Sequence, residues 1–339
     1  MGVKLGDLVK KRSIAEGELK GWTIGLDAYN IFYQFVSSIR TREGHLLTNE
    51  EGRVVSHLKG ILTRTSNMIE EGIRPVYIFD GKPHELKKGT LDLRKERKEK
   101  ARKEWEDALE KGDMEVAKKK AQQTSRLTDE MIDDSKRLLD LMGIPYIISP
   151  GEGEAQASYM CRKKNIDAVS SQDFDTLLFG CPLLIRNLAI SGKRKLPGRK
   201  IWINVEREII DLEETLTSLS LTREQLVDMA ILMGTDFNEG VKGIGPKKAL
   251  KLISEYGDLE NAAKADRIPL LEWSEVRNIF LDPDITDDYE ISWSAPREEE
   301  LIDYLVEEMD FGRSGVMRSI RLMKVEDDCP SQSSLDSFF

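Results

Sequence analysis

Trp22-Thr-Ile-Gly-Leu-Asp27 and Val76-Tyr-Ile-Phe-Asp80 are the stretches of sequence that decide the fold. Each is a short apolar run that ends in an aspartate, and two more runs, Asp167 to Asp173 and Ala230 to Asp236, end in the same way. Short apolar runs bounded by Gly, Pro and Asp are typical of buried strands, and helical patterns between them predict a mainly parallel sheet. The predicted fold class is therefore α/β.

The acids at these run ends are expected to meet, because reacting groups gather outside the carboxyl ends of parallel strands. Two like charges about 4 Å apart repel by roughly 4 kcal/mol at an effective dielectric constant near 20, so such a cluster requires cations. Hard oxygen ligands select Mg²⁺ or Mn²⁺, and a carboxylate-held metal pair usually serves phosphoryl chemistry. The seven candidate acids are Asp27, Asp80, Glu152, Glu154, Asp173, Asp175 and Asp236.

Other interpretations of these acids stay open at this point. A single Asp at the end of a strand is more often a turn former or a helix cap than a ligand. Asp173-Phe-Asp175-Thr176 also imitates a phosphatase pattern in which an aspartate nucleophile follows a strand, which would give an aspartyl-phosphate enzyme. That pattern usually stands near the N-terminus, whereas here two acid-tipped strands precede it, so the two-metal site is favoured.

The composition favours a large intracellular protein. The 339 residues suffice for one large α/β domain or two smaller ones. No apolar run reaches about 18 residues, so no membrane span is expected, and the first residues lack the apolar core of a signal peptide. Three cysteines without metal-type spacing indicate a reduced compartment.

The net charge of −10 does not exclude nucleic acid, because binding follows local patches rather than the total. From Lys87 to Lys103, nine basic residues face three acidic ones, a local net charge of +6. A second basic cluster consists of Lys193, Arg194, Lys195, Arg199 and Lys200. A solvated face would explain either cluster alone, but two clusters beside an acidic metal site favour nucleic acid.

Local patterns also predict the order of the elements. Residues 1–80 are expected to run helix, strand, helix, strand, and 88–140 to be helical with a break near Gly112. A helix is expected at 152–164, mostly helices beyond Leu221, and a disordered tail from about Val325. Residues 192–200 read as a turn-rich basic loop. Further strands are expected at 146–149, 168–171, 183–188 and 201–205.

Two further motifs predict binding. In Gly243-Ile-Gly245-Pro-Lys247-Lys248 a small-residue turn precedes a helix whose N-terminal amides suit a phosphate, although a turn packed in the core is the alternative. It is not a nucleotide-binding P-loop, because Pro follows Gly245. The chain ends in Gln332-Ser-Ser-Leu335-Asp-Ser-Phe338-Phe339, and aromatic residues on such a tail favour a docking motif over a chance apolar end.

In order and spacing these motifs resemble the flap endonuclease family, structure-specific nucleases related to XPG, in its archaeal form. The resemblance covers the whole chain and is carried by Asp27-Ala, Phe79-Asp80-Gly-Lys-Pro, Pro150-Gly-Glu152-Gly-Glu154-Ala, Gln172-Asp173-Phe-Asp175, Gly234-Thr-Asp236-Phe and Gly243-Ile-Gly-Pro-Lys-Lys. It implies a PIN-like core with a central mainly parallel sheet, a helical arch and a C-terminal helical DNA-binding region with a helix–hairpin–helix-like turn.

The resemblance implies a single nuclease domain at 1–324 and a clamp-binding tail at 325–339. Within the domain it implies an N-terminal part at 1–98, an arch at about 82–130, an internal part at about 140–236 and a helix-turn-helix part at about 221–260. The implied activity is 5′ flap endonuclease with 5′–3′ exonuclease, cutting a phosphodiester near the junction with duplex in Okazaki fragment maturation and DNA repair.

Residue roles follow from the resemblance, position by position. The implied ligands of one Mg²⁺ are Asp27, Asp80, Glu152 and Glu154. Asp173 and Asp175 are the implied ligands of the other, with Asp236 acting through water and Mn²⁺ as a substitute metal. Lys87 and Arg94 match the basic pair that the family aims at the scissile phosphate. Tyr33 matches an aromatic residue that stacks on a base beside the cut.

The resemblance also implies the partners, namely branched DNA with a 5′ flap and the sliding clamp (PCNA). Duplex phosphates would be gripped, with a K⁺ ion at the glycine turn, by Lys193, Arg194, Lys195, Gly243, Gly245, Lys247 and Lys248. The clamp would be bound by Gln332, Leu335, Phe338 and Phe339. His84 stands where many relatives have a second Pro, and we expect it to alter the gateway entrance rather than the chemistry. A monomer is expected, in the cytoplasm if the source is archaeal.

Two rival functions remain at this stage. A sister nuclease that cuts junctions or repair bubbles would share the acids, but such relatives typically differ in the arch region. A non-catalytic, clamp-tethered DNA scaffold would be free to lose some acids, and all seven are present.

Overall fold

The structure is a computed structural model that describes residues 2–190, 193–195, 202–266, 268 and 273–324. The predicted tail at 325–339, with its four clamp-binding residues, lies outside these ranges. Within them, no helix is long and apolar enough to cross a membrane.

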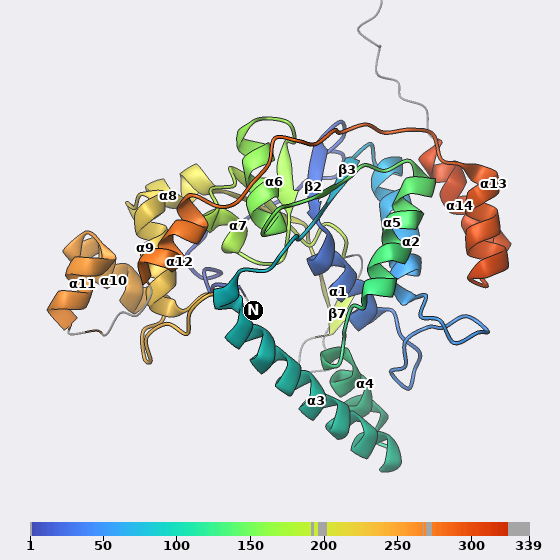
Figure 1. Cartoon of the computed structure of the whole chain (residues 1–339), viewed down its shortest axis with the longest axis horizontal. Coiled ribbons are helices and arrows are strands. Elements are labelled where there is room, and N and C mark those ends of the chain that lie inside the picture. Colours follow the sequence, from blue (N-terminus) through green and yellow to red (C-terminus); the bar gives the residue numbers. More distant parts are fainter. Residues whose placement is uncertain (1, 191–192, 196–201, 267, 269–272, 325–339) are drawn as a thin grey trace, which may run out of the picture.

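A seven-stranded sheet forms the centre of the molecule, in the order β1-β9-β6-β5-β2-β3-β4 (Figure 1). The five parallel strands are β2 (Thr23–Asp27), β3 (Arg74–Phe79), β4 (Tyr146–Ile148), β5 (Ala168–Ser170) and β6 (Leu183–Arg186). At one edge, β9 (Glu208–Asp211) runs antiparallel to β6, and β1 (Arg12–Ser13) pairs with β9. The predicted α/β class with a mainly parallel sheet is confirmed.

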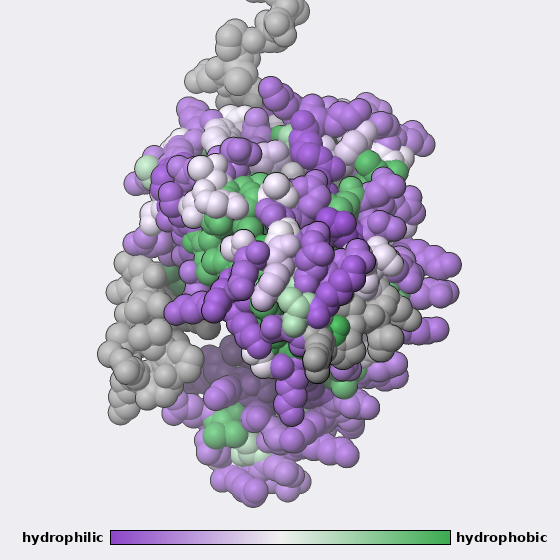
Figure 2. All heavy atoms as spheres, turned by 90° about the vertical axis from the view of Figure 1, so that its left-hand side faces the viewer, coloured by the Kyte–Doolittle hydropathy of each residue, from purple (hydrophilic) through white to green (hydrophobic). Residues whose placement is uncertain are grey.

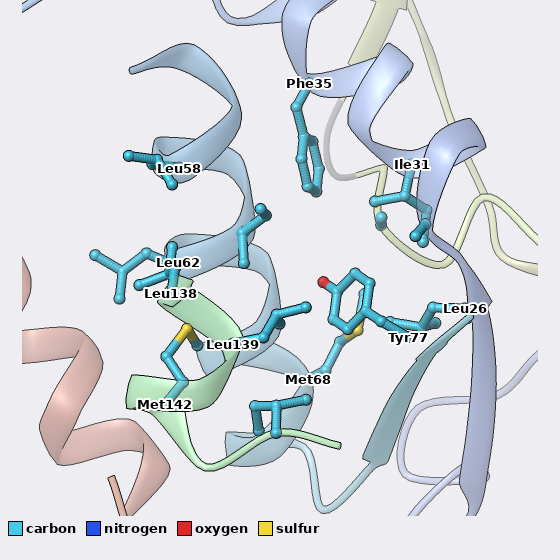
Figure 3. Close-up of a cluster of buried hydrophobic side chains, with 14 of the residues drawn as sticks. Leu26, Ile31, Phe35, Leu58, Leu62, Met68, Tyr77, Leu138, Leu139 and Met142 are labelled. Carbon is cyan, nitrogen blue, oxygen red and sulfur yellow. The ribbon is translucent and has the colours of Figure 1, made fainter. Parts of the chain in front are cut away.

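Helices cover both faces of this sheet, as alternate residues of the central strand β3 show. Tyr77 and Phe79 belong to a core that includes residues of α1 (Ala28–Ser38), α2 (Ser56–Glu70) and α5 (Asp129–Met142). Figure 3 shows the labelled side chains of these helices gathered around Tyr77. On the opposite face, Val76 and Ile78 lie in a second cluster with residues of α6 (Gly153–Arg162). The carboxyl edge of the sheet is therefore held between fixed helices.

A pair of helices, α3 (Lys88–Glu110) and α4 (Met114–Gln123), extends away from the sheet (Figure 1). The 3₁₀ turn η1 (Glu85–Lys87) leads directly into α3. The predicted break near Gly112 is confirmed, because this glycine has a φ of 69° between the two helices. In α3 the buried side chains are Ala101 and Ala108, so the helix is mostly exposed.

Another hydrophobic core, which is mostly helical, lies beside the sheet. It contains residues of α7 (Asp175–Leu178), α8 (Leu212–Leu219), α9 (Arg223–Met233), α10 (Pro246–Tyr256), α11 (Leu259–Asp266) and α12 (Trp273–Leu281). The side of the molecule that carries α10 and α11 presents mainly hydrophilic side chains with small apolar areas between them (Figure 2). The chain then crosses to α13 (Glu298–Ile302), the π-helical η2 (Asp303–Glu308) and α14 (Arg313–Met323), which packs on α2.

Three details differ from the sequence prediction. The expected first helix is wrong: residues 2–21 form turns and the strand β1, because this segment runs along β9 and to the acids at the sheet edge. The basic loop is partly wrong, since Lys193–Lys195 form β7 and pair with β8 (Trp202–Asn204). Strand β9 was not predicted at all.

Candidate active site

One cavity at the carboxyl edge of the sheet is lined by all seven predicted acids together with Lys87, Arg94 and Tyr33. Five elements supply the acids. Asp27 ends β2, Asp80 follows β3, and Asp173 and Asp175 follow β5. Glu152 and Glu154 lie at the start of α6, and Asp236 follows α9. Residues far apart in sequence thus meet because parallel strands end at one edge.

Asp27 and Glu154 share one hydroxyl group. Ser171 Oγ lies 3.2 Å from Asp27 Oδ2 and 2.8 Å from Glu154 Oε1. Because a hydroxyl has a single proton to donate, Ser171 can satisfy only one of these carboxylates at a time. Thr176 Oγ1 also donates to Glu154, at 3.0 Å, and Asp27 caps α1 by accepting from the Asn30 amide at 3.0 Å.

Asp173 and Asp175 are held by the first residues of the chain. The Gly2 amide donates to Asp173 Oδ1 at 3.1 Å, and the Val3 amide donates to Asp175 Oδ1 at 2.7 Å. A Cβ on residue 2 would lie 2.8 Å from Asp173 Oδ1, so the close approach requires a glycine. On the other side, Asn30 Nδ2 donates to Asp173 Oδ2 at 3.0 Å. These positioning residues were missed by sequence reasoning.

Asp80 is fixed by the glycine turn between Glu152 and Glu154. The Gly153 amide donates to Asp80 Oδ1 at 2.7 Å, and a Cβ at Gly153 would lie 2.9 Å from the same oxygen. Gly153 therefore lets the start of α6 approach the end of β3. This close contact brings the two glutamates and Asp80 to one wall of the cavity.

The protein does not balance the charges of the inner acids Asp27, Glu154 and Asp175. Burial, together with the charges of Asp80 and Asp173, raises the pKa of Asp27 to about 8. Burial, with the charges of Asp173 and Asp236, raises the pKa of Asp175 to about 7. The pKa of Glu154 is raised well above its ordinary value by burial and by Asp27. The inner acids therefore require bound cations or protons at neutral pH.

Two basic side chains from the helix pair reach the outer acids. Lys87 forms an ion pair with Glu152, and Arg94 forms one with Asp236. Burial lowers the pKa of Lys87, but the charges of Glu152 and Asp80 outweigh it and leave this pKa above its ordinary value. Farther along α3, Lys98 Nζ lies 4.6 Å from the centre of the Tyr33 ring. The predicted basic pair thus lies at the mouth of the acidic cavity.

The donor set fits hard divalent cations. All seven acids offer carboxylate oxygens, the ligands that Mg²⁺ and Mn²⁺ prefer, and the inner ones lack compensating positive charge. Across the part of the chain that the structure describes, no group of three or more His, Cys, Asp or Glu side chains is arranged so that it could hold a metal ion as it stands. Lys87 and Arg94 form ion pairs with Glu152 and Asp236. These two acids would have to release their basic partners in order to bind a metal ion.

The predicted duplex-binding residues lie outside this cavity. Gly245 is the N-cap residue of α10 and Pro246 is at its first position, while Gly243 has a φ of 85° in the preceding turn. Lys247 and Lys248 follow in the first turn of α10, and Lys248 Nζ lies 3.9 Å from Asp266. Gly243, Gly245, Lys247 and Lys248 are all exposed. For Lys193–Lys195 the structure gives the β7 backbone.

Comparisons with known proteins agree with this geometry. The XPG N-terminal domain model matches residues 1–101, and the XPG I-region model matches residues 143–236. Flap endonuclease 1 of Methanosarcina barkeri is 48% identical over 339 residues, all of both chains. Flap endonuclease-1 from Methanococcus jannaschii superposes with a TM-score of 0.76 at 39% identity, covering 95% of this chain and 98% of that one. The catalytic core of Rad2 in complex with DNA substrate, 23% identical, shares the fold, with a TM-score of 0.72 over 95% of this chain and 100% of that one.

Fold, acidic edge and family models together define a nuclease of the XPG class, an enzyme that hydrolyses phosphodiester bonds. Because the chain is 48% identical to archaeal flap endonucleases over its full length, the class can be specified further: the chain belongs to the flap endonuclease family. The resemblance inferred from the sequence motifs is thereby confirmed.

Proposed function

We propose that this flap endonuclease cuts a 5′ flap beside its junction with duplex DNA and leaves a nick that a ligase can seal. The observation that supports this most directly is the single cavity in which seven acids face Lys87, Arg94 and Tyr33 at the base of an exposed helix pair. A single strand that passes this pair would bring one phosphodiester to the acids. The same site would support 5′–3′ exonuclease action, in Okazaki fragment maturation and repair.

Two Mg²⁺ ions, replaceable by Mn²⁺, are the cofactors that the acids would hold. One ion would be bound by Asp27, Asp80, Glu152 and Glu154. The other would be bound by Asp173 and Asp175, with Asp236 acting through water. When bound, such a pair activates the attacking water and stabilises the leaving oxygen.

The protein's own groups would orient the phosphate and neutralise its charge. Lys87, at the end of η1, and Arg94, on the adjoining α3, both line the cavity. A phosphodiester gains negative charge as water attacks, and preorganised cations stabilise that charge in a site with little water. The half-exposed ring of Tyr33, at 37% exposure, offers a face on which a base next to the cut could stack.

Binding of the rest of the substrate would rely on phosphate contacts and shape. The amides and lysines at the start of α10 suit a duplex phosphate, together with a K⁺ ion at the turn of Gly243 and Gly245. We include Lys193, Arg194 and Lys195 in this surface because of their charge. The tail residues Gln332, Leu335, Phe338 and Phe339 would dock a monomer of the enzyme on the sliding clamp.

Cleavage of 5′-labelled double-flap DNA tests the proposal, with a four-way junction and a repair bubble as competing substrates. We expect release of an intact flap in Mg²⁺ and no release in EDTA, with much slower cutting of the other two DNAs. Preferred cutting of the junction or the bubble would identify a sister nuclease instead. Tight binding of flap DNA without any cutting in Mg²⁺ or Mn²⁺ would favour a scaffold.

A further inference from the structure

We propose that His84 is a positioning residue for Lys87. Its ring caps the helix that presents Lys87 to the cavity and ties the first turn of that helix to the region around α12. The inference rests on the proposed role of Lys87 at the scissile phosphate and adds to it a residue that lies outside the acid-lined cavity.

The first line of support is the cap itself. His84 has extended backbone angles, φ −65° and ψ 147°, directly before η1, and its Nδ1 accepts from the Leu86 amide at 3.3 Å. Its carbonyl oxygen accepts from the Lys87 amide at 3.0 Å. The side chain of His84 thus caps the Leu86 amide, which the start of a helix leaves without a partner, while its backbone carbonyl accepts the first hydrogen bond of η1, from the Lys87 amide.

The second line of support is an aromatic ring that both residues touch. The rings of His84 and Phe237 lie edge to face, with centroids 6.3 Å apart and an interplanar angle of 87°. Lys87 Nζ lies 5.7 Å from the centre of the same Phe237 ring. Phe237 follows the acid Asp236 and packs against Phe280 of α12 at 5.4 Å. His84 and Lys87 therefore contact the same buried side chain, which lies beside the acids.

A third contact points the other ring nitrogen toward α12. Because Nδ1 accepts from an amide, the neutral ring carries its proton on Nε2, which lies 3.9 Å from Glu275 Oε1. The side chains of His84 and Glu275 are 38% and 54% exposed, so this contact is weakly stabilising and mainly orients the ring. His84, Glu275 and Glu152 line a second cavity behind the Lys87–Glu152 pair, which leaves the turn room to shift if the ring is lost.

The expected consequence is a change in cleavage rate at nearly constant stability. Misplacing a reacting or charge-stabilising group by 1 Å can cost about a hundredfold in rate. Loss of a helix cap changes the equilibrium constant for formation of the first helical turn by roughly tenfold. The population of the correctly formed turn should therefore change by no more than this factor. DNA affinity should barely change, because other surfaces hold the phosphates.

The test is single-turnover cleavage of saturating double-flap DNA by the full chain. His84→Ala should slow cleavage by about three- to tenfold, the scale of one lost cap. His84→Asn, which restores a capping oxygen, should lie within about twofold of the wild type. Glu275→Gln should also stay within about twofold because its contact is exposed. Dissociation constants in EDTA should match that of the wild type for all variants, and the melting temperature of His84→Ala should fall by no more than a few degrees.

A double-mutant cycle shows whether His84 acts through Lys87. In a Lys87→Met background, His84→Ala should slow cleavage no further, because the group that it positions is gone. A wild-type rate for His84→Ala, an equal slowing in the Lys87→Met background, or no rescue by His84→Asn would each overturn the proposal. A wild-type rate for Lys87→Met would instead show that the proposed role of Lys87 fails, and the positioning role with it.

Discussion

The acids and the cations of the site are held in opposite ways. Asp27 ends β2 and Asp175 follows β5; both are almost fully buried, at 7% and 5% exposure, and both accept hydrogen bonds from backbone amides. Lys87 ends the 3₁₀ turn η1 and Arg94 lies on the mostly exposed helix α3, and their side chains are 15% and 36% exposed. The sheet therefore holds these acids, whereas the segment of η1 and α3 that extends from the sheet holds the cations.

This difference matches what each half of the site must do. Metal ligands must be held within a fraction of an ångström, which strands and backbone hydrogen bonds achieve. Cations that meet a phosphate entering from solvent need freedom to exchange partners, since each already pairs with an acid. We infer that the sheet edge sets the chemistry, whereas the side chains of Lys87 and Arg94 exchange their acidic partners for the substrate. The following variants test that division.

Asp173→Ala should have the largest effect. It removes a carboxylate from the centre of the acid cluster, and cleavage of flap DNA should fall by at least about 10³-fold, more than the loss of one transition-state donor. Binding of flap DNA in EDTA should stay near the wild-type value, because the phosphate-binding surfaces are untouched. The exposed Asp133→Ala is the control and should cut normally. Comparable losses of binding and cutting would contradict a purely catalytic role for Asp173.

Arg94→Met should slow single-turnover cleavage by about a hundredfold, the scale of one lost charge-stabilising group. Lys103 lies on the same helix, is exposed and has the same charge, so Lys103→Met is a matched control that should act within about threefold. If both variants weaken DNA binding equally and cut normally once saturated, Arg94 only attracts DNA. The helix would then attract DNA through its charge and take no part in the cleavage step.

Much of the acidic half could be predicted from the sequence, because its signal is local. An apolar run that ends in Asp marks both a buried strand and its carboxyl end, and parallel strands bring such ends together without further information. Asp27, Asp80 and Asp173 were located in this way. The Gly-Glu-Gly-Glu turn carried a second local signal, because its two glutamates directly follow another apolar run.

The supports of these acids could not be predicted, because they depend on contacts across the whole chain. Gly2 and Val3 reach Asp173 and Asp175 from about 170 positions away, and nothing near Gly2 in the sequence marks that partnership. The same segment was expected to be helical, and its amides instead serve carboxylates. Ser171 between two acids is a similar case, because a serine after a strand has many uses.

Asp175→Asn should stabilise the metal-free protein. The folded pKa of Asp175, about 7, exceeds its ordinary 3.8, so the folded state keeps a proton that the unfolded chain releases. Stability of the wild type therefore falls as pH rises from about 4 to 7. In EDTA at pH 8 the variant should be more stable by on the order of 2–4 kcal/mol, with the difference vanishing near pH 4. Urea unfolding at both pH values measures this, with Asp133→Asn as the control.

The smallest effect is expected on the helix pair itself. Lys120 of α4 forms an ion pair with Glu104 of α3, with side chains 29% and 37% exposed. Exposed pairs contribute little, so Glu104→Gln should change single-turnover cleavage by less than about twofold. A much larger loss, with binding unchanged, would show that α3 and α4 must be locked together for Lys87 and Arg94 to act. The segment of η1 and α3 would then be as rigid a part of the site as the sheet edge, and the division between fixed acids and adjustable cations would fail.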